Sequence, residues 1–173
     1  MEFIFETIYD QKGIAVMAEA LRKTIRKKKS KKQHVWVILI IILAVILSIP
    51  KNNEEFVITF NLVITWFAVI VMVLALIFQD KINGYFARKR MITGMEKSIT
   101  TFKEDSYVSA TNIGKTEFYY KNILEIAENN DYFIFIFDQS HAQIYDKKCI
   151  TRGNIDEFRN FITKKTDKEI KAI

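Results

Sequence analysis

The stretch FVITFNLVITWFAVIVMVLALIF, residues 56–78, decides the architecture of this chain. It runs for 23 residues without an ionisable side chain. At about 1.5 Å per residue, a helix of this length exceeds the roughly 30 Å hydrocarbon core of a bilayer. The sequence therefore predicts a membrane-spanning helix over residues 56–78.

A second apolar run, VWVILIIILAVILSI, occupies residues 35–49. It is short for a span, but flanking lysines can extend their stems along it and keep their ammonium groups in water. We predict a first span over residues 34–50 and a short external turn over residues 51–55. A buried helix of a soluble core is the disfavoured alternative, because only the polar turn PKNNEE separates the two runs.

The charge distribution gives the orientation of this predicted hairpin. The net charge is +6, and the excess lies beside the apolar runs, with +5 in residues 1–33, +2 in residues 79–96 and none in residues 97–173. Cytoplasmic flanks of spans carry an excess of Lys and Arg. We therefore expect a multi-pass protein of the cell membrane with both termini cytoplasmic. The first run lies too far from Met1, and lacks a cleavage site, to be a removed signal peptide.

The segment before the first span, residues 1–33, reads as a strand followed by a basic amphipathic helix. Residues 3–9 are β-branched and aromatic, and Asp10 is a candidate cap for a helix with apolar residues at helical spacing. We expect its C-terminal end to be the lysine-rich run. The candidate membrane-surface residues on both flanks are Arg26, Lys27, Lys28, Lys29, Lys31, Lys32, Arg88, Lys89 and Arg90. Such clusters serve as topology signals and also bind anionic lipid head groups, and both readings stay open.

Residues 79–96 read as a connector, with a helical continuation of the second span that ends near Gly94. Residues 97–173 then contain short β-prone runs separated by turn residues. The short spacing predicts an antiparallel meander, and YFIFIF, apolar on both faces, suits a central strand. Asn154 and Glu157 resemble a capping box that opens a closing helix, and we expect the tail from Lys164 to fray. Whether the N-terminal strand joins this sheet stays open.

The search for catalytic, metal and phosphate motifs finds none. His34 and His141 have no partners at metal-ligand spacing, and Gly114-Lys115-Thr116 lacks the upstream glycine of a phosphate loop. The region 97–173 is neutral, unlike a nucleic-acid-binding domain. We therefore expect no enzymatic activity, no cofactor, no metal and no nucleic-acid partner. The single cysteine, Cys149, agrees with a reducing compartment.

The layout resembles the bacterial YcxB-like membrane protein family. The residues that carry the resemblance are Phe102, Glu104, Asp105, Tyr120, Ile123, Ile126, Glu128, Tyr132 to Phe137 and the helix Phe158 to Ile162. The resemblance implies a cytoplasmic domain with a pleckstrin-homology-like (PH-like) fold in a bacterial membrane protein. The fold class is thus α+β, with a two-helix transmembrane hairpin and an antiparallel sheet domain that ends in a helix.

Two functional hypotheses follow. The first is a cytoplasmic PH-like binding or regulatory module, held at the bilayer by the hairpin, with an anionic lipid head group, another protein or a second copy of the chain as partner. The second is an oligomeric channel, transporter accessory or immunity-type protein that acts within the membrane. The lack of ionisable residues inside either span favours the first, although Asn61 could bond across a helix pair.

Overall fold

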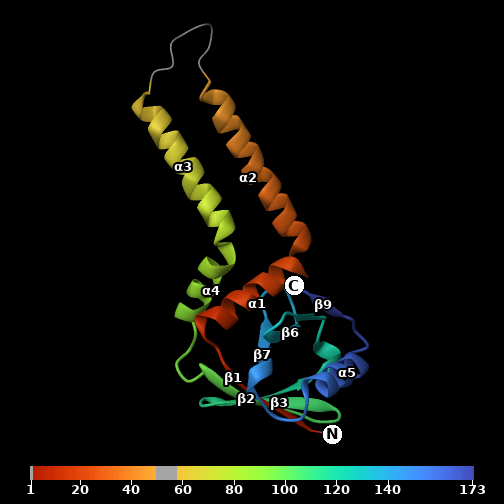
Figure 1. Ribbon diagram of the computed structural model, residues 1–173. Coiled ribbons are helices and arrows are strands. Elements are labelled where there is room, and N and C mark those ends of the chain that lie inside the picture. The colour runs from red at the N-terminus through yellow and green to blue at the C-terminus, as the bar shows by residue number, and fades with distance from the viewer. Residues whose placement is uncertain (1, 50–57) are drawn as a thin grey trace. The chain divides into compact units, whose positions relative to one another are not determined.

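The computed structural model describes residues 2–49 and 58–173 (Figure 1). The chain divides into two compact units, which we describe separately. The sheet unit combines the residues up to Arg26 with Asp80–Ile173, and the helical unit is Lys27–Gln79. The sheet unit is therefore built from both sides of the predicted hairpin.

The sheet unit contains two sheets. The first has the strand order β4-β3-β2-β1-β8 and is antiparallel throughout. Its strands are β1 (Phe3–Ile8), β2 (Lys97–Phe102), β3 (Ser106–Thr111), β4 (Gly114–Tyr119) and β8 (Ile150–Arg152). The second sheet has the order β7-β6-β5-β9. Its strands are β5 (Glu125–Glu128), β6 (Tyr132–Ile136), β7 (Ala142–Asp146) and β9 (Ile170–Ala172).

The N-terminal strand β1 joins the first sheet, between β2 and β8. Its register with β2 runs over six residue pairs, from Phe3 opposite Phe102 to Ile8 opposite Lys97. The whole helical unit is inserted between these two neighbouring strands. The pairing answers the question that the sequence left open about this strand.

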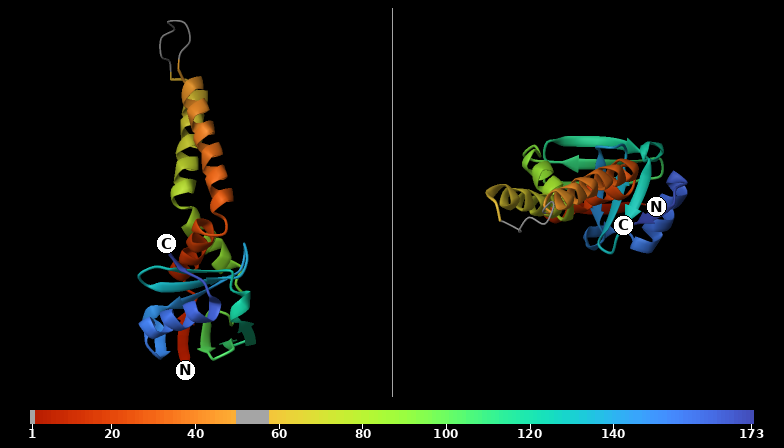
Figure 2. Two further views of the ribbon diagram at one scale, coloured as in Figure 1. Left: turned by 90° about the vertical axis from the view of Figure 1, so that its right-hand side faces the viewer. Right: turned by 90° about the horizontal axis from the view of Figure 1, so that it is seen from above.

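An aromatic core fills the space between the two sheets, and helix α5 (Ile155–Thr166) covers it (Figure 2). Phe158 of α5 is fully buried and lies at its centre, with its ring centroid 4.7 Å from that of Phe5 and 4.9 Å from that of Phe102. Asn154 caps the helix through a bond from the backbone N–H of Asp156 to its side chain. At Gly153, φ is +97°, and an added Cβ would lie 2.2 Å from the ring of Phe3.

Strand β6 is buried on both faces, as YFIFIF predicts. Phe133 and Phe135 belong to the aromatic core, whereas Ile134 and Ile136 face helix α1 (Gln11–Lys23). The alternation of side chains along a strand sends neighbours to opposite faces. A helix on one face and the second layer on the other therefore explain the unbroken apolar run. Asp10 caps α1 through the N–H of Gly13.

Helix α4 (Gln79–Lys89) packs against α1 within the sheet unit. Gly84 allows the close approach, because a Cβ there would lie 2.9 Å from the backbone of Ala15. Arg22 of α1 donates to Asp80 of α4 through Nε, 2.9 Å from Oδ1, and through Nη2, 2.7 Å from Oδ2. The two helices that flank the insertion in sequence are thus joined by a forked ion pair.

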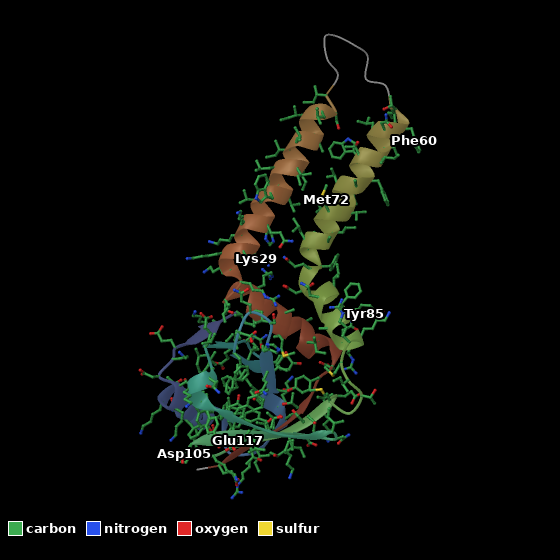
Figure 3. The ribbon with its side chains drawn as sticks, turned by 180° about the vertical axis from the view of Figure 1, so that it is seen from behind. Lys29, Phe60, Met72, Tyr85, Asp105 and Glu117 are labelled. Atoms are coloured by element: carbon green, nitrogen blue, oxygen red, sulfur yellow. The ribbon has the colours of Figure 1, made fainter. Side chains whose placement is uncertain are left out.

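The helical unit contains α2 (Lys27–Leu47) and α3 (Phe60–Ile77), which lie side by side (Figure 1). Both are long and apolar enough to cross a membrane, and only 0% and 6% of their most apolar windows are buried. Figure 3 marks Lys29 at the start of α2 and Phe60 and Met72 along α3. Gln79 bonds His34 Nε2 at 3.2 Å, while Nδ1 of the same ring lies 2.7 Å from the carbonyl oxygen of Ser30. The predicted external turn, residues 51–55, lies outside the described residues, as do the ends of both predicted spans at 50, 56 and 57.

The prediction that the lysine-rich run forms the C-terminal end of the amphipathic helix is wrong. Helix α1 ends at Lys23. At its end, the N–H and the hydroxyl of Thr24 both donate to the carbonyl oxygen of Ala20, and the N–H of Arg26 donates to the carbonyl oxygen of Leu21. The lysines from Lys27 onward open α2 instead. They therefore lie at the positive end of a helix dipole, where cations gain nothing from it.

The end of the chain is also more ordered than expected. Helix α5 continues to Thr166, and Asp167 adopts a left-handed conformation with φ 52° that ends it. The chain then returns, and β9 pairs in parallel with β5, a pairing that the predicted antiparallel meander lacked. In the connector, α4 ends at Lys89 rather than near Gly94, which lies in a turn with φ +94°.

We predict that Phe158→Ala lowers the free energy of unfolding of the sheet unit by about 3–5 kcal/mol, because it removes a ring from the closed centre of the core. The matched control is Phe86→Ala, an aromatic residue of α4 that is 51% exposed. Hydrogen exchange of β2 and β6 in the full chain measures the change. Equal protection in the two variants would contradict the assigned core.

Candidate functional site

The candidate membrane-surface residues do not form one site within either unit. Five of them lie in the first turns of α2 in the helical unit, namely Lys27, Lys28, Lys29, Lys31 and Lys32. The other four belong to the sheet unit, namely Arg26, Arg88, Lys89 and Arg90. Two of these four bond the sheet unit itself: Arg26 donates to the carbonyl of Gln139, and Arg88 donates to the carbonyl of Tyr9.

The inward face of the first sheet changes character along its strands. Cross-strand partners form three rows on this face. The first row is aromatic: Phe3, Phe102, Tyr107 and Phe118. The second is mixed: Phe5, Thr100, Ser109 and Thr116. The third carries hydroxyls and a glycine: Thr7, Ser98, Thr111 and Gly114. Because side-chain volume falls from the first row to the third, the two layers leave unfilled space at that end.

A cavity of about 510 Å³ occupies this space. Its floor is formed by the sheet residues Ser109, Thr111 and Thr116, and β7 contributes Ala142 and Gln143. The remaining apolar wall comes from other parts of the sheet unit, namely Tyr9, Met17, Met91, Met95, Ile113, Phe118 and Phe137. A volume of this size, with apolar walls and few polar groups, is typical of a small-molecule site.

One side of the cavity rests on a buried polar network. The hydroxyls of Tyr107 and Tyr145 both donate to Gln143 Oε1, at 3.0 and 2.6 Å. Burial raises the pKa of both phenols well above the ordinary value, so they stay protonated donors. Two donors on one amide oxygen fix the orientation of Gln143.

The cavity carries little free positive charge, because the register puts Lys115, opposite Ala110, on the other face of β4 from Thr116. Its lining residues include Lys115 and His141 and no Asp or Glu. Lys115 has no ion-pair partner among residues 2–49 and 58–173, whereas His141 pairs with Asp138 at 2.7 Å. The basic run Arg88–Arg90 directly precedes Met91, and Arg88 holds the carbonyl of Tyr9 in the same wall.

A second, shallower hollow lies beside an ion-pair cluster. The Glu128 carboxylate lies 2.6 Å from both Lys147 Nζ and Arg159 Nη2. Burial raises the pKa of Glu128, but the bonds from Arg159 and Lys147 outweigh it, so the pKa lies below its ordinary value. The same hydrogen bond raises the pKa of the Arg159 guanidinium, because it favours the charged form of both partners. With Asp156, which also pairs with Arg159, the cluster is electrically neutral, and it joins α5 to β5.

Clusters of possible metal ligands and the one cysteine were the remaining candidates for reactive groups in the described part of the chain. Over residues 2–49 and 58–173, no three His, Cys, Asp or Glu side chains could hold a metal ion together. Cys149 is partly buried, and burial raises the pKa of its thiol, which leaves little reactive thiolate. His34 and His141 lie in different units.

Sequence reasoning missed the cavity. Its lining residues come from five separated segments, and no linear motif joins them. The one signal present was the hydroxyl residues at inward strand positions, Ser109, Thr111 and Thr116, where a closed core would carry apolar side chains. That signal becomes readable only once the register of β3 and β4 is known.

Comparison with known proteins identifies one family. The profile of the YcxB family, described as YcxB-like protein, matches residues 102–162, which run from the end of β2 into α5. This match confirms the resemblance inferred from the sequence. Its description names no activity or ligand. Neither the curated proteins nor the solved structures yielded a match.

We predict that Glu128→Gln lowers the free energy of unfolding at pH 7 by about 1–2 kcal/mol, since it leaves Lys147 and Arg159 without their shared carboxylate in a partly exposed site. The pKa of Glu128 is lower in the folded protein than in the unfolded chain. The carboxylate therefore contributes fully to stability at a pH above its unfolded pKa, and this contribution is lost as the pH falls through its folded pKa. Thermal unfolding between pH 7 and pH 3 measures this.

The control is Asp156→Asn, which removes the more exposed partner of Arg159. We expect it to change stability by less than about 0.5 kcal/mol at any pH. A Glu128→Gln deficit that persisted undiminished at the acidic end would contradict the assigned role of the carboxylate.

Proposed function

We propose that this protein is a non-enzymatic binding module anchored in the bacterial cell membrane, with α2 and α3 as a spanning hairpin and the sheet unit in the cytoplasm. One observation carries the proposal: two exposed apolar helices are inserted between two paired strands of a folded unit. A second copy of the chain or another protein is the additional partner in this proposal.

Exposure of the apolar helices supports a lipid environment. Large contiguous apolar surfaces are rare on soluble monomers. The core helix of a soluble protein would be mostly buried, yet α2 and α3 expose almost all of their apolar windows. In bilayer hydrocarbon the same surface is favourable, and the backbone bonds of a helix are satisfied internally.

Pairing of β1 with β2 supports a hairpin with both ends on one side. The strands flank the insertion and contact each other directly, so the chain must cross the bilayer an even number of times between them. Cleavage of the first span as a signal peptide would also remove Phe3 and Phe5, which are fully buried. The excess of Lys and Arg on these flanks favours the cytoplasm as the shared side.

The strand layout supports the PH-like assignment. The strands β1 to β4 form one antiparallel run, β5 to β7 form a second, and α5 closes the space between the two sheets. The helical unit would then be an insertion between the first two strands of the module. Folds of this kind host many functions, so the assignment concerns architecture and the cavity carries the binding hypothesis.

The first test of this proposal is the topology. In a Cys149→Ala background, we expect Gly114→Cys to react with a membrane-impermeant maleimide only after permeabilisation, because the β3–β4 turn is exposed on the cytoplasmic unit. Asn53→Cys, in the predicted external turn, should react in intact cells. Labelling of Gly114→Cys from outside would overturn the orientation, and release of the chain by carbonate would overturn the anchoring.

A second test concerns the lysines of α2. With Trp66→Phe, Trp36 is the remaining tryptophan and lies on α2 near these lysines. We expect brominated phosphatidylglycerol to quench Trp36 more than brominated phosphatidylcholine at low salt, because each well-placed cation contributes about 1 kcal/mol toward anionic lipid.

The variant replaces Lys27, Lys28, Lys29, Lys31 and Lys32 by Gln and should abolish this preference. The matched control replaces five lysines of the sheet unit, Lys103, Lys121, Lys164, Lys168 and Lys171, and should retain it. A preference unaffected by the first set would leave those lysines as topology signals only.

A further inference from the structure

We propose that the free edge of β4 pairs with β4 of a second copy of this chain, antiparallel about a two-fold axis at Thr116, so that the first sheet continues from one copy into the other. This inference rests on the proposed function, because anchoring in one bilayer gives two chains the same orientation and raises their effective concentration. All of the residues involved belong to the sheet unit, so the argument does not depend on where the helical unit lies.

Strand β4 is the most open of the four edge strands in the described ranges 2–49 and 58–173. Five of its six residues are exposed. The edge strands β8 and β9 have only three residues each, and β7 is half buried and contacts α1. Only alternate residues of β4 bond β3, so the other backbone N–H and C=O groups face away from the sheet. An edge of this length is a template for another strand.

The outward face of β4 carries one charge of each sign. Lys115 and Glu117 lie on this face, and neither has an ion-pair partner in the described part of the chain. The Ser106 hydroxyl donates to Glu117 Oε1 and holds the carboxylate on this face, and Figure 3 labels Glu117 on the sheet. Charges on an edge oppose the addition of an arbitrary strand, but they attract a strand that carries the same charges in reverse order.

A single antiparallel register of β4 with itself pairs both charges. With Thr116 opposite Thr116, Lys115 of each copy lies opposite Glu117 of the other, which gives two cross-strand ion pairs. A shift by one residue would set outward side chains opposite inward ones. The next registers would set Lys115 opposite Lys115 or Glu117 opposite Glu117, and like charges directly opposite each other are destabilising. The segment Lys-Thr-Glu is therefore self-complementary about Thr116.

The same register completes the inward face of the joined sheet. Phe118 of each copy would lie opposite Gly114 of the other, where an added Cβ meets nothing within 4 Å. An aromatic ring across the strand pair supplies the packing that a glycine in an edge strand lacks. Because Gly114 and Thr116 line the cavity, the second copy would also cover that end of it.

The test uses the full chain in isolated membranes, with Thr116→Cys in a Cys149→Ala background. At the two-fold axis the two Cα atoms lie about 4.5–5.5 Å apart, within the range that a disulfide spans. Oxidation with copper phenanthroline should therefore give a disulfide-linked dimer on a non-reducing gel. The matched control is Val108→Cys on β3, which lies three strand spacings from its copy, at least about 14 Å, and should not crosslink.

Charge reversal tests the register. Lys115→Glu or Glu117→Lys, each added to Thr116→Cys, sets like charges opposite each other and should slow crosslinking about tenfold. When the two variants are co-expressed with different tags, they should crosslink with each other as fast as the parent chain, because each carries the charges that the other lacks. The control Lys164→Glu, on α5, changes the net charge equally and should leave crosslinking unchanged.

The outcomes separate the two proposals. Crosslinking that survives both reversals, a mixed pair that is no faster than the single variants, or no dimer from Thr116→Cys would overturn the paired edge. A disulfide from Thr116→Cys to another protein, in place of the second copy, would overturn it as well. Carbonate extraction of the same membranes reports the anchoring: release of the chain would count against the proposed function, whereas an anchored chain that does not crosslink would overturn the dimer alone.

Discussion

The pairing of β1 with β2 is the constraint on which the rest of the structure depends. The six pairs of this register join residues on the two sides of the inserted helices. They place Phe3 and Phe5 in the aromatic core and allow α1 to cover the second sheet. The ion pair of Arg22 with Asp80 then joins the two helices that lead into and out of the insertion. Without β1, strand β8 would have no partner in the first sheet.

The same register explains why one face of one sheet performs two tasks. Aromatic partners at one end build a closed core around Phe158, and hydroxyl partners at the other end leave a cavity. Closing that end with larger side chains would add apolar burial of about 25 cal/mol per Å². The chain instead has Ser109, Thr111 and Thr116 there. These small polar side chains bury less apolar surface than larger ones would, and they leave the cavity open.

Local patterns predicted much of this fold. The apolar runs predicted two long helices, YFIFIF predicted a doubly covered strand, and Asp10 and Asn154 predicted helix caps, because each signal lies within a few residues. The break between α1 and α2 escaped prediction although the bonds that mark it, from Thr24 to Ala20 and from Arg26 to Leu21, are local. The parallel pairing of β9 escaped prediction because it depends on contacts between distant segments, such as the N–H of Ile173 on the carbonyl of Glu128. The cavity escaped for the same reason, because its lining residues are far apart in the sequence.

The long separation between β1 and β2 has a consequence for biosynthesis. The partner of Ile8 is Lys97, roughly 90 residues later, so the first strand leaves the ribosome several seconds before its neighbour at about 5–20 residues per second. Throughout that interval Phe3 and Phe5 have no core to enter. Translation must therefore deliver the entire inserted segment before the first strand can be used, and folding of the sheet becomes a late event in the maturation of this polypeptide.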